Sequence, residues 1–122
     1  MFNFDEIIER SNGLFIRAIY DTIRCYDTHC GTPIELSKEI FIETLRYIIL
    51  NDIGILAFRD WVENREELIN SDLDTQLSYI YQSFPTEYDE DIPEKDIENL
   101  WWYTACPVDI GWKQKNGSYW FS

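Results

Sequence analysis

The chain has 122 residues, which is enough for one domain with one core and too few for two. Hydrophobic residues make up 45% of the chain and aromatic residues 16%, so the composition predicts a packed interior and excludes a disordered chain. Acidic residues outnumber basic residues by 23 to 10, and the net charge is −13. This negative field repels phosphate backbones and anionic lipid, which argues against nucleic acid or a membrane surface as a partner.

The N-terminal residues and the cysteines favour a cytoplasmic protein. Residues 1–6 carry acids where a secretory signal has a basic region. The longest apolar run, residues 48–50, is far shorter than the roughly 20 apolar residues of a membrane span. The chain has three cysteines, Cys25, Cys30 and Cys106. An odd number is not typical of a protein held together by disulfides, so we expect buried thiols.

Helical spacing dominates the first half of the chain. Apolar residues recur every three or four positions over residues 4–26, and Ser11-Asn12-Gly13 interrupts them, so we expect either a kinked helix or two short helices. After a loop, the same spacing predicts a helix over residues 36–51. Gly54 follows at a position suited to a left-handed C-cap, and residues 55–58 form an apolar run of strand length.

The second half begins with a helix and ends with a hairpin. Ser71-Asp72-Leu73-Asp74 resembles a capping box, and the helical pattern behind it ends at Pro85. An acidic loop over residues 86–98 follows, with room for a helical turn opened by its proline. Asn116-Gly117 then lies between aromatic-rich runs, which predicts a tight hairpin because both residues accept positive φ. The sequence predicts one domain over residues 1–122, of α+β class, with three to four helices packed against a small antiparallel C-terminal sheet.

The acidic residues are concentrated in the middle of the chain. Residues 60–98 hold 13 of the 23 acids and only two bases, whereas residues 99–122 hold one acid and two lysines. Such a run is either a solvated face or a docking surface for a cationic protein. Tyr88 and Trp101 are candidate aromatic anchors for docking, while Trp102, Trp112 and Trp120 are expected in the core.

No familiar catalytic constellation is present in the sequence. It has no glycine-rich phosphate loop, no Gly-x-Ser-x-Gly elbow and no His-Glu-x-x-His motif, so we expect neither an enzyme nor a cofactor. The alternative is an uncharacterised metal-binding protein or enzyme that uses Cys25, His29 and Cys106, with Cys30 as a further possible ligand. Their spacing matches no paired Cys-x-x-Cys site, so we predict no metal centre.

From Gly54 onward, the order of motifs resembles that of a known family. The helix ending at Phe84-Pro85 is followed by the acidic loop, Trp101-Trp102-Tyr103, Cys106-Pro107 and the Asn116-Gly117 hairpin. This order is similar to that of a family of small acidic bacterial proteins of unknown function, some of which lie beside contact-dependent growth inhibition toxins and are taken as their immunity proteins. The resemblance implies no catalytic residues.

The resemblance and the acidic segment together predict an immunity protein that binds and neutralises a cognate toxin, a basic nuclease. The alternative of a partner-binding module without a toxin stays open. The predicted toxin-binding residues are Asp60, Glu63, Glu66, Glu67, Glu87, Tyr88, Asp89, Glu90, Asp91, Glu94, Asp96 and Glu98.

Overall fold

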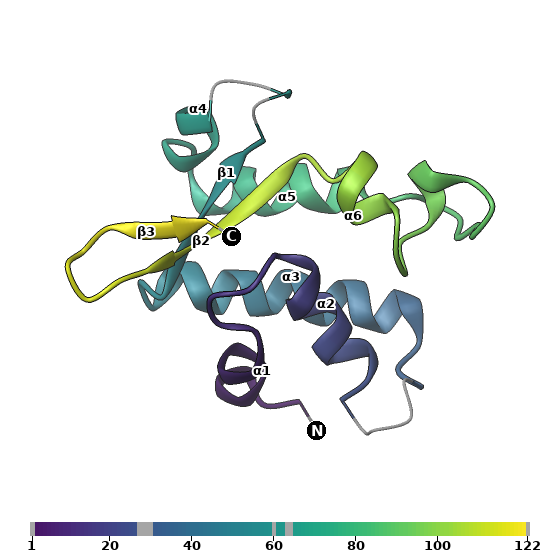
Figure 1. The fold of residues 1–122 in the computed structure, drawn as a ribbon, viewed down its shortest axis with the longest axis horizontal. Helices are drawn as coiled ribbons and strands as arrows, with labels where there is room; N and C mark the ends of the chain where they lie inside the picture. Colours follow the sequence, from purple (N-terminus) through teal and green to yellow (C-terminus); the bar gives the residue numbers. More distant parts are fainter. Residues whose placement is uncertain (1, 27–30, 60, 63–64, 122) are drawn as a thin grey trace.

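Helices on both sides of a small sheet make up the fold (Figure 1). The computed structural model describes residues 2–26, 31–59, 61–62 and 65–121, without the side chains at positions 65 and 66. Six α-helices and a three-stranded antiparallel sheet lie in these ranges, which confirms the predicted α+β class. The elements are α1 (Phe4–Ser11), α2 (Arg17–Arg24), α3 (Ile34–Leu50), β1 (Gly54–Phe58), α4 (Arg65–Ile69), α5 (Leu73–Ser83), the 3-10 helix η1 (Pro93–Lys95), α6 (Trp101–Thr104), β2 (Val108–Lys113) and β3 (Tyr119–Phe121).

The N-terminal stripe forms two short helices, α1 and α2, rather than one kinked helix. Asn3 caps α1, because its side-chain oxygen accepts a hydrogen bond from the Glu6 amide at 3.2 Å. Gly13 turns the chain between the helices at φ +83°, a conformation that a side chain would strain. Both helices then pack near α3, which runs beside α5 through the middle of the molecule (Figure 1).

The predicted helix and strand of the first half are confirmed as α3 and β1, but the role predicted for Gly54 is wrong. The left-handed residue after α3 is Asp52, at φ 55°, and Gly54 is the first residue of β1. A Cβ atom at Gly54 would lie only 2.8 Å from the carbonyl oxygen of Gly111 on β2. Glycine is therefore required here by the close approach of two strands and not by the helix end.

The helix α5 begins at its acidic cap and ends before a proline, as predicted, but the cap is not the serine. Asp72 is the N-cap, and its carboxylate accepts a hydrogen bond from the Thr75 amide at 2.7 Å. Ser71 instead donates its hydroxyl to the Glu67 carbonyl oxygen at 3.0 Å. Asp72 therefore satisfies one of the amides that a helix N-terminus leaves without a partner.

The sheet has the strand order β1-β2-β3, and the hairpin β2–β3 confirms the Asn-Gly prediction in outline. Gly117 has φ +87°, but Asp52 is the only non-glycine residue of the described chain with a positive φ. Asn116 therefore does not adopt the positive φ that it could accept. The Asn116 side chain accepts a hydrogen bond from the Ser118 amide at 3.0 Å, so it stabilises the turn as a side-chain acceptor.

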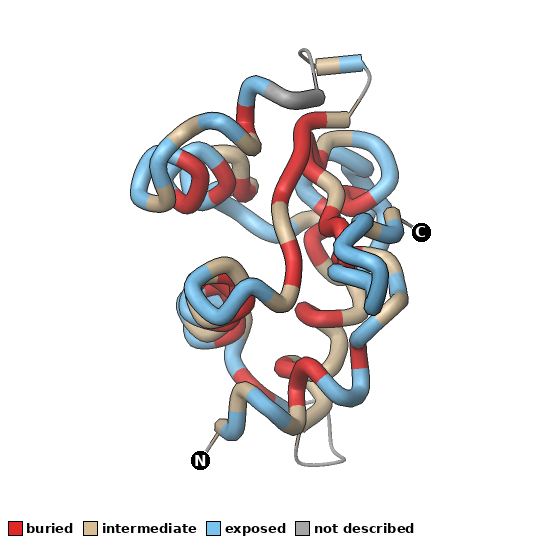
Figure 2. Tube along the Cα trace, turned by 90° about the vertical axis from the view of Figure 1, so that its left-hand side faces the viewer, coloured by how far each residue is buried: buried red, intermediate tan, exposed pale blue. Residues whose placement is uncertain are grey.

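Aromatic rings from the N-terminal helices and from the second half of the chain pack together in the core. Figure 2 shows how the buried residues are distributed along the chain. Trp102 is fully buried, and its ring centroid lies 5.3 Å from that of Phe41 on α3 and 5.2 Å from that of Tyr20 on α2. Trp112 is also fully buried, so both are core residues as predicted. Trp120 is 56% exposed, which makes the core prediction for it wrong, because it lies on the edge strand β3.

Candidate protein-binding surface

The acidic connector, defined as residues 86–98, folds into a compact turn at one end of the molecule (Figure 1). Pro93 opens η1 inside it, as the sequence predicts. The Asp91 amide donates to the Asp89 carboxylate at 2.9 Å, and the Asp89 amide donates to the Lys95 carbonyl oxygen at 3.2 Å. These bonds close the turn on itself, so the backbone between them holds its side chains in a defined arrangement.

The C-terminal part of the connector is fastened to the N-terminal helices. Glu98 forms an ion pair with Arg24 of α2 at 2.6 Å, and both side chains are mostly buried. Arg17 donates to the Glu98 carbonyl oxygen at 2.9 Å. Asp96 is 5% exposed, and its carboxylate accepts a hydrogen bond from the Leu100 amide at 3.1 Å. The structure therefore places Asp96 and Glu98, two of the predicted toxin-binding residues, in internal contacts.

Most of the other connector side chains are exposed, the cation Lys95 among them, and we call six of these exposed residues the connector face. It carries four exposed carboxylates and two exposed apolar side chains; its residues are Glu87, Tyr88, Glu90, Asp91, Ile92 and Glu94. Tyr88 is 44% exposed and Ile92 is 38% exposed, so each has apolar surface that a partner can cover. Partial desolvation, helped by the carboxylates of Asp96, Glu90 and Glu98, raises the pKa of Tyr88 above its ordinary value. Like any tyrosine hydroxyl at neutral pH, that of Tyr88 is protonated and can donate a hydrogen bond.

Trp101 is buried in the core, whereas Ile92 is exposed on the connector face. Trp101 is 1% exposed and packs with its ring centroid 4.8 Å from that of Trp102, so the prediction of Trp101 as an interface anchor is wrong. Ile92 is absent from the predicted site, although it is an apolar residue between Asp91 and Pro93. Ile97 has similar acidic neighbours in the sequence and is fully buried, so the sequence holds no signal that separates the two isoleucines.

The predicted acidic segment is divided into two surfaces by α5. Glu67 is exposed on α4, next to the N-terminal end of α5, whereas the connector follows the C-terminal end (Figure 1). The 11 residues of α5 separate the two by about 16 Å of helix. Asp60 and Glu63 lie outside the described residues, as does the side chain of Glu66. Asp89 is half-buried and is not part of the connector face.

The cysteine positions bear on the alternative of a metal site or a reactive thiol. Cys25 is disulfide-bonded, which differs from the buried thiols that the sequence analysis expects. Cys106 has a free thiol that is fully buried, and burial raises the pKa of Cys106 to about 12. Within residues 2–26, 31–59, 61–62 and 65–121, no group of three or more His, Cys, Asp and Glu residues could hold a metal ion. His29 and Cys30 lie outside the described residues, so the Cys/His alternative stays a prediction.

In the part of the chain that the structure describes, no helix combines the length and the apolar character that a membrane crossing requires.

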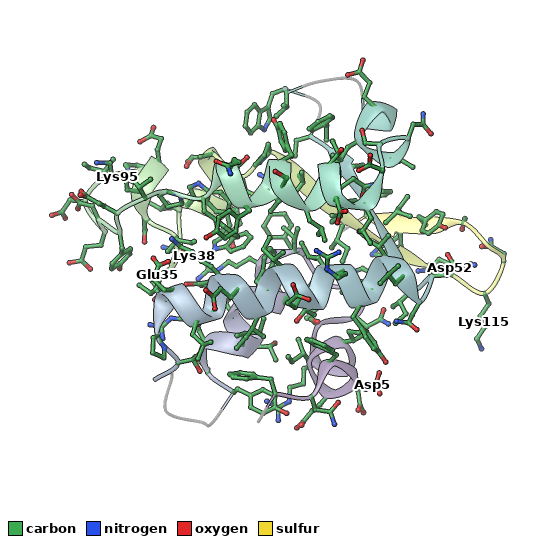
Figure 3. All side chains as sticks on the ribbon, turned by 180° about the vertical axis from the view of Figure 1, so that it is seen from behind. Asp5, Glu35, Lys38, Asp52, Lys95 and Lys115 are labelled. Atoms are coloured by element: carbon green, nitrogen blue, oxygen red, sulfur yellow. The ribbon has the colours of Figure 1, made fainter. Side chains whose placement is uncertain are left out.

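A hollow next to the connector is lined by seven residues that include Glu35, Tyr81 and Pro85. It is partly filled by Lys38, whose ammonium group donates to the Pro85 carbonyl oxygen at 3.2 Å and to Glu35 at 3.1 Å (Figure 3).

These features define a small acidic α+β protein whose described surface offers a folded acidic turn with apolar contacts. Residues 61–121 match the model of the family described as "Protein of unknown function, DUF596", and the chain belongs to this family. The match includes α5, the connector and the β2–β3 hairpin. Neither the curated proteins nor the solved structures contain a significant match to the chain.

Proposed function

We propose that this protein is an immunity protein that binds a cognate toxin domain and blocks it without catalysis. The connector face carries this proposal, because it holds four exposed carboxylates and two apolar side chains on a turn with internal hydrogen bonds. A nuclease domain exposes Lys and Arg side chains that bind phosphates, and these cations are the complement of such a face. The resemblance to a family of small acidic bacterial proteins, some of which are taken as immunity proteins, supports the same assignment.

In the proposed mechanism, charge speeds association with the toxin and apolar contact slows dissociation. Carboxylates on the connector face attract the basic toxin and pair with the cations that otherwise hold substrate phosphates. Tyr88 and Ile92 are exposed apolar side chains whose burial slows dissociation. The toxin is then inhibited stoichiometrically, because its phosphate-binding side chains are occupied.

The test is to purify this protein with the toxin domain encoded directly upstream of it. The proposal predicts an equimolar complex on gel filtration and complete loss of toxin activity at equimolar ratio. No complex together with undiminished toxin activity would refute it.

A matched pair of charge reversals locates the surface. Glu90→Lys changes the connector face, and Glu67→Lys makes the same change on the exposed surface of α4. We expect Glu90→Lys to weaken toxin binding by about tenfold or more, because it places like charges together, and Glu67→Lys to change it less than about threefold. The reverse order would move the toxin-binding surface to α4.

A further inference from the structure

A second surface lies between the N-terminal residues and α3. It is an open hollow of about 260 Å³, which we call the α3 hollow. Four of its six lining residues are apolar; the residues are Phe2, Phe4, Leu36, Glu39, Ile40 and Glu43. Leu36 is 42% exposed, so a large aliphatic side chain on the central helix faces solvent at this place. Exposed apolar surface rimmed by charge is typical of protein-binding sites.

The walls of the hollow are held in position by contacts outside it. The ring of Phe2 lies 4.9 Å from that of Tyr26, and the ring of Phe4 lies 5.2 Å from that of Tyr47, measured between centroids. Tyr47 in turn donates its hydroxyl to Asp5 at 2.7 Å. The hollow is therefore already formed before a partner arrives, which lowers the conformational cost of binding.

The charge along α3 indicates the sign of the charge that a partner should carry. Glu35, Glu39 and Glu43 recur every four residues, so their carboxylates follow one face of the helix. Like charges at this spacing destabilise a helix by a few tenths of a kcal/mol per pair. Two of the three have a cation beside them: the Lys38 ammonium group lies 3.1 Å from Glu35 (Figure 3), and the Arg46 guanidinium group lies 3.6 Å from Glu43. Arg46 is shared with a further carboxylate, that of Asp74, at 3.2 Å. Among the described residues Glu39, in the middle of the row and in the lining of the hollow, forms no ion pair. The apolar hollow thus lies beside an acidic helix face whose central carboxylate can meet a cation of a partner.

This pattern fits a cationic amphipathic helix. Its apolar face would fill the hollow, and Lys or Arg side chains spaced four residues apart would lie opposite the row of carboxylates. An anionic membrane or a nucleic acid is repelled by the same carboxylates. We propose that the α3 hollow binds a cationic amphipathic helix of a partner protein. The proposal concerns a different surface from the connector face, and its test does not use the toxin.

The probe is a fluorescein-labelled Lys/Leu peptide about four helical turns long, with its lysines and leucines on opposite faces. Fluorescence anisotropy measures its binding to the full chain at moderate salt. A second peptide has glutamine in place of every lysine and tests the need for charge. We expect the Lys/Leu peptide to bind, and the Gln/Leu peptide to bind at least tenfold more weakly.

Matched variants distinguish the hollow from general attraction to an acidic protein. Leu36→Ser removes apolar contact in the hollow, and Leu50→Ser makes the same change at an exposed position of α3 outside it. Glu39→Gln removes a carboxylate of the row, and Glu9→Gln removes an exposed carboxylate of α1. Because all four side chains are exposed, circular dichroism should show unchanged folds.

The proposal predicts that Leu36→Ser weakens peptide binding by about tenfold and Glu39→Gln by about threefold, while the control variants change it less than twofold. Equal effects in the hollow variants and their controls would overturn it, as would no binding of the Lys/Leu peptide. Self-association that Leu36→Ser abolishes in sedimentation would also overturn it, because the hollow would then be covered by a second copy of this chain.

Discussion

At the scale of single residues, burial and close approach decide the properties that the sequence leaves open. Cys106 is an unremarkable thiol in the sequence, but the structure buries it completely and raises its pKa to about 12. Gly54 reads as a helix cap, but the structure places it against the backbone of β2. For Gly54 the deciding neighbour, Gly111, is far away in the chain. The Cys106 thiol donates to the carbonyl oxygen of Val108, only two residues further on, and it is the packing of the core around it that buries the sulfur.

Cys106 should resist alkylation in the folded protein. Iodoacetamide reacts with the thiolate, and a thiol with a raised pKa has almost no thiolate at pH 8; burial also excludes the reagent. We expect modification of Cys106 at least a hundredfold slower in the folded protein than in urea, followed by peptide mass spectrometry. Equal rates in the two states would show that Cys106 is accessible.

Gly54→Ala should destabilise the fold, because the new Cβ would meet the Gly111 carbonyl oxygen at 2.8 Å and a methyl carbon of Ile48 at 3.1 Å. We expect a loss of about 1 to 3 kcal/mol in the free energy of unfolding, measured by urea denaturation. Gly31→Ala is the control, since no atom lies within 4 Å of a Cβ at that position. A loss in Gly31→Ala as large as that in Gly54→Ala would argue against the steric explanation.

At the scale of elements, long periodic segments are predictable and short ones are not. Helix α3 is 17 residues long, and its apolar stripe predicts both the helix and the position of each end to within two residues. By contrast α4 and α6 have five and four residues, too few for a hydrophobic period to show, and neither is predicted. The sequence also identifies Asp72 as part of a cap but cannot tell it from Ser71, because both side chains can accept an amide hydrogen bond.

Two replacements of Asp72 should distinguish the contribution of its capping hydrogen bond from the contribution of its negative charge. The hydrogen bond from the Thr75 amide lowers the pKa of Asp72 in the folded state. The carboxylate therefore stabilises the fold above its unfolded pKa, near 3.9, and this contribution is lost as the pH falls through the folded pKa. Asp72→Ala should lower the urea midpoint at pH 7, because the capping hydrogen bond is lost. Asp72→Asn should have a midpoint at pH 7 close to that of the wild type, and its midpoint should fall less than that of the wild type as the pH is lowered. Equal midpoints for Asp72→Ala and the wild type would argue against the cap.

The ion pair between Arg24 and Glu98 should couple α2 to the connector. Both side chains are about one-fifth to one-quarter exposed, so water screens the pair only in part. A double-mutant cycle of Arg24→Met and Glu98→Gln should give a coupling energy of about 1 kcal/mol in urea denaturation. The cycle subtracts the other contacts of Arg24, among them its hydrogen bond to the Thr32 carbonyl oxygen. A coupling energy of zero would mean that the pair does not fasten the connector.

At the scale of the whole molecule, the sequence predicts how much negative charge the middle segment carries but not how it is distributed in space. Helix α5 divides the segment, Asp96 and Glu98 turn inward, and Trp101 is covered by the aromatic core. Composition cannot show which acids turn inward, because that depends on partners such as Arg24, which is 74 residues away in the chain. What remains exposed is the connector face at one end of the long axis, with the hairpin that carries Lys115 at the other (Figures 1 and 3).

This separation of charge makes the connector face the expected point of first contact with a basic partner. A charge-neutralised connector variant replaces Glu87, Glu90, Asp91 and Glu94 by their amides. A control variant makes the same net change at exposed acids elsewhere, namely Glu9, Glu39, Glu67 and Asp74. The two variants have equal net charge, so they differ only in where the negative charge is removed.

The most direct test of the account is the association rate constant of the toxin domain with these two variants, measured by stopped-flow fluorescence at rising salt. The account predicts that the connector variant associates at least tenfold more slowly than the wild type at low salt and loses most of its salt dependence, while the control variant slows less than about threefold. Equal slowing in both variants would contradict it, because the toxin would then respond to net charge and not to the connector face.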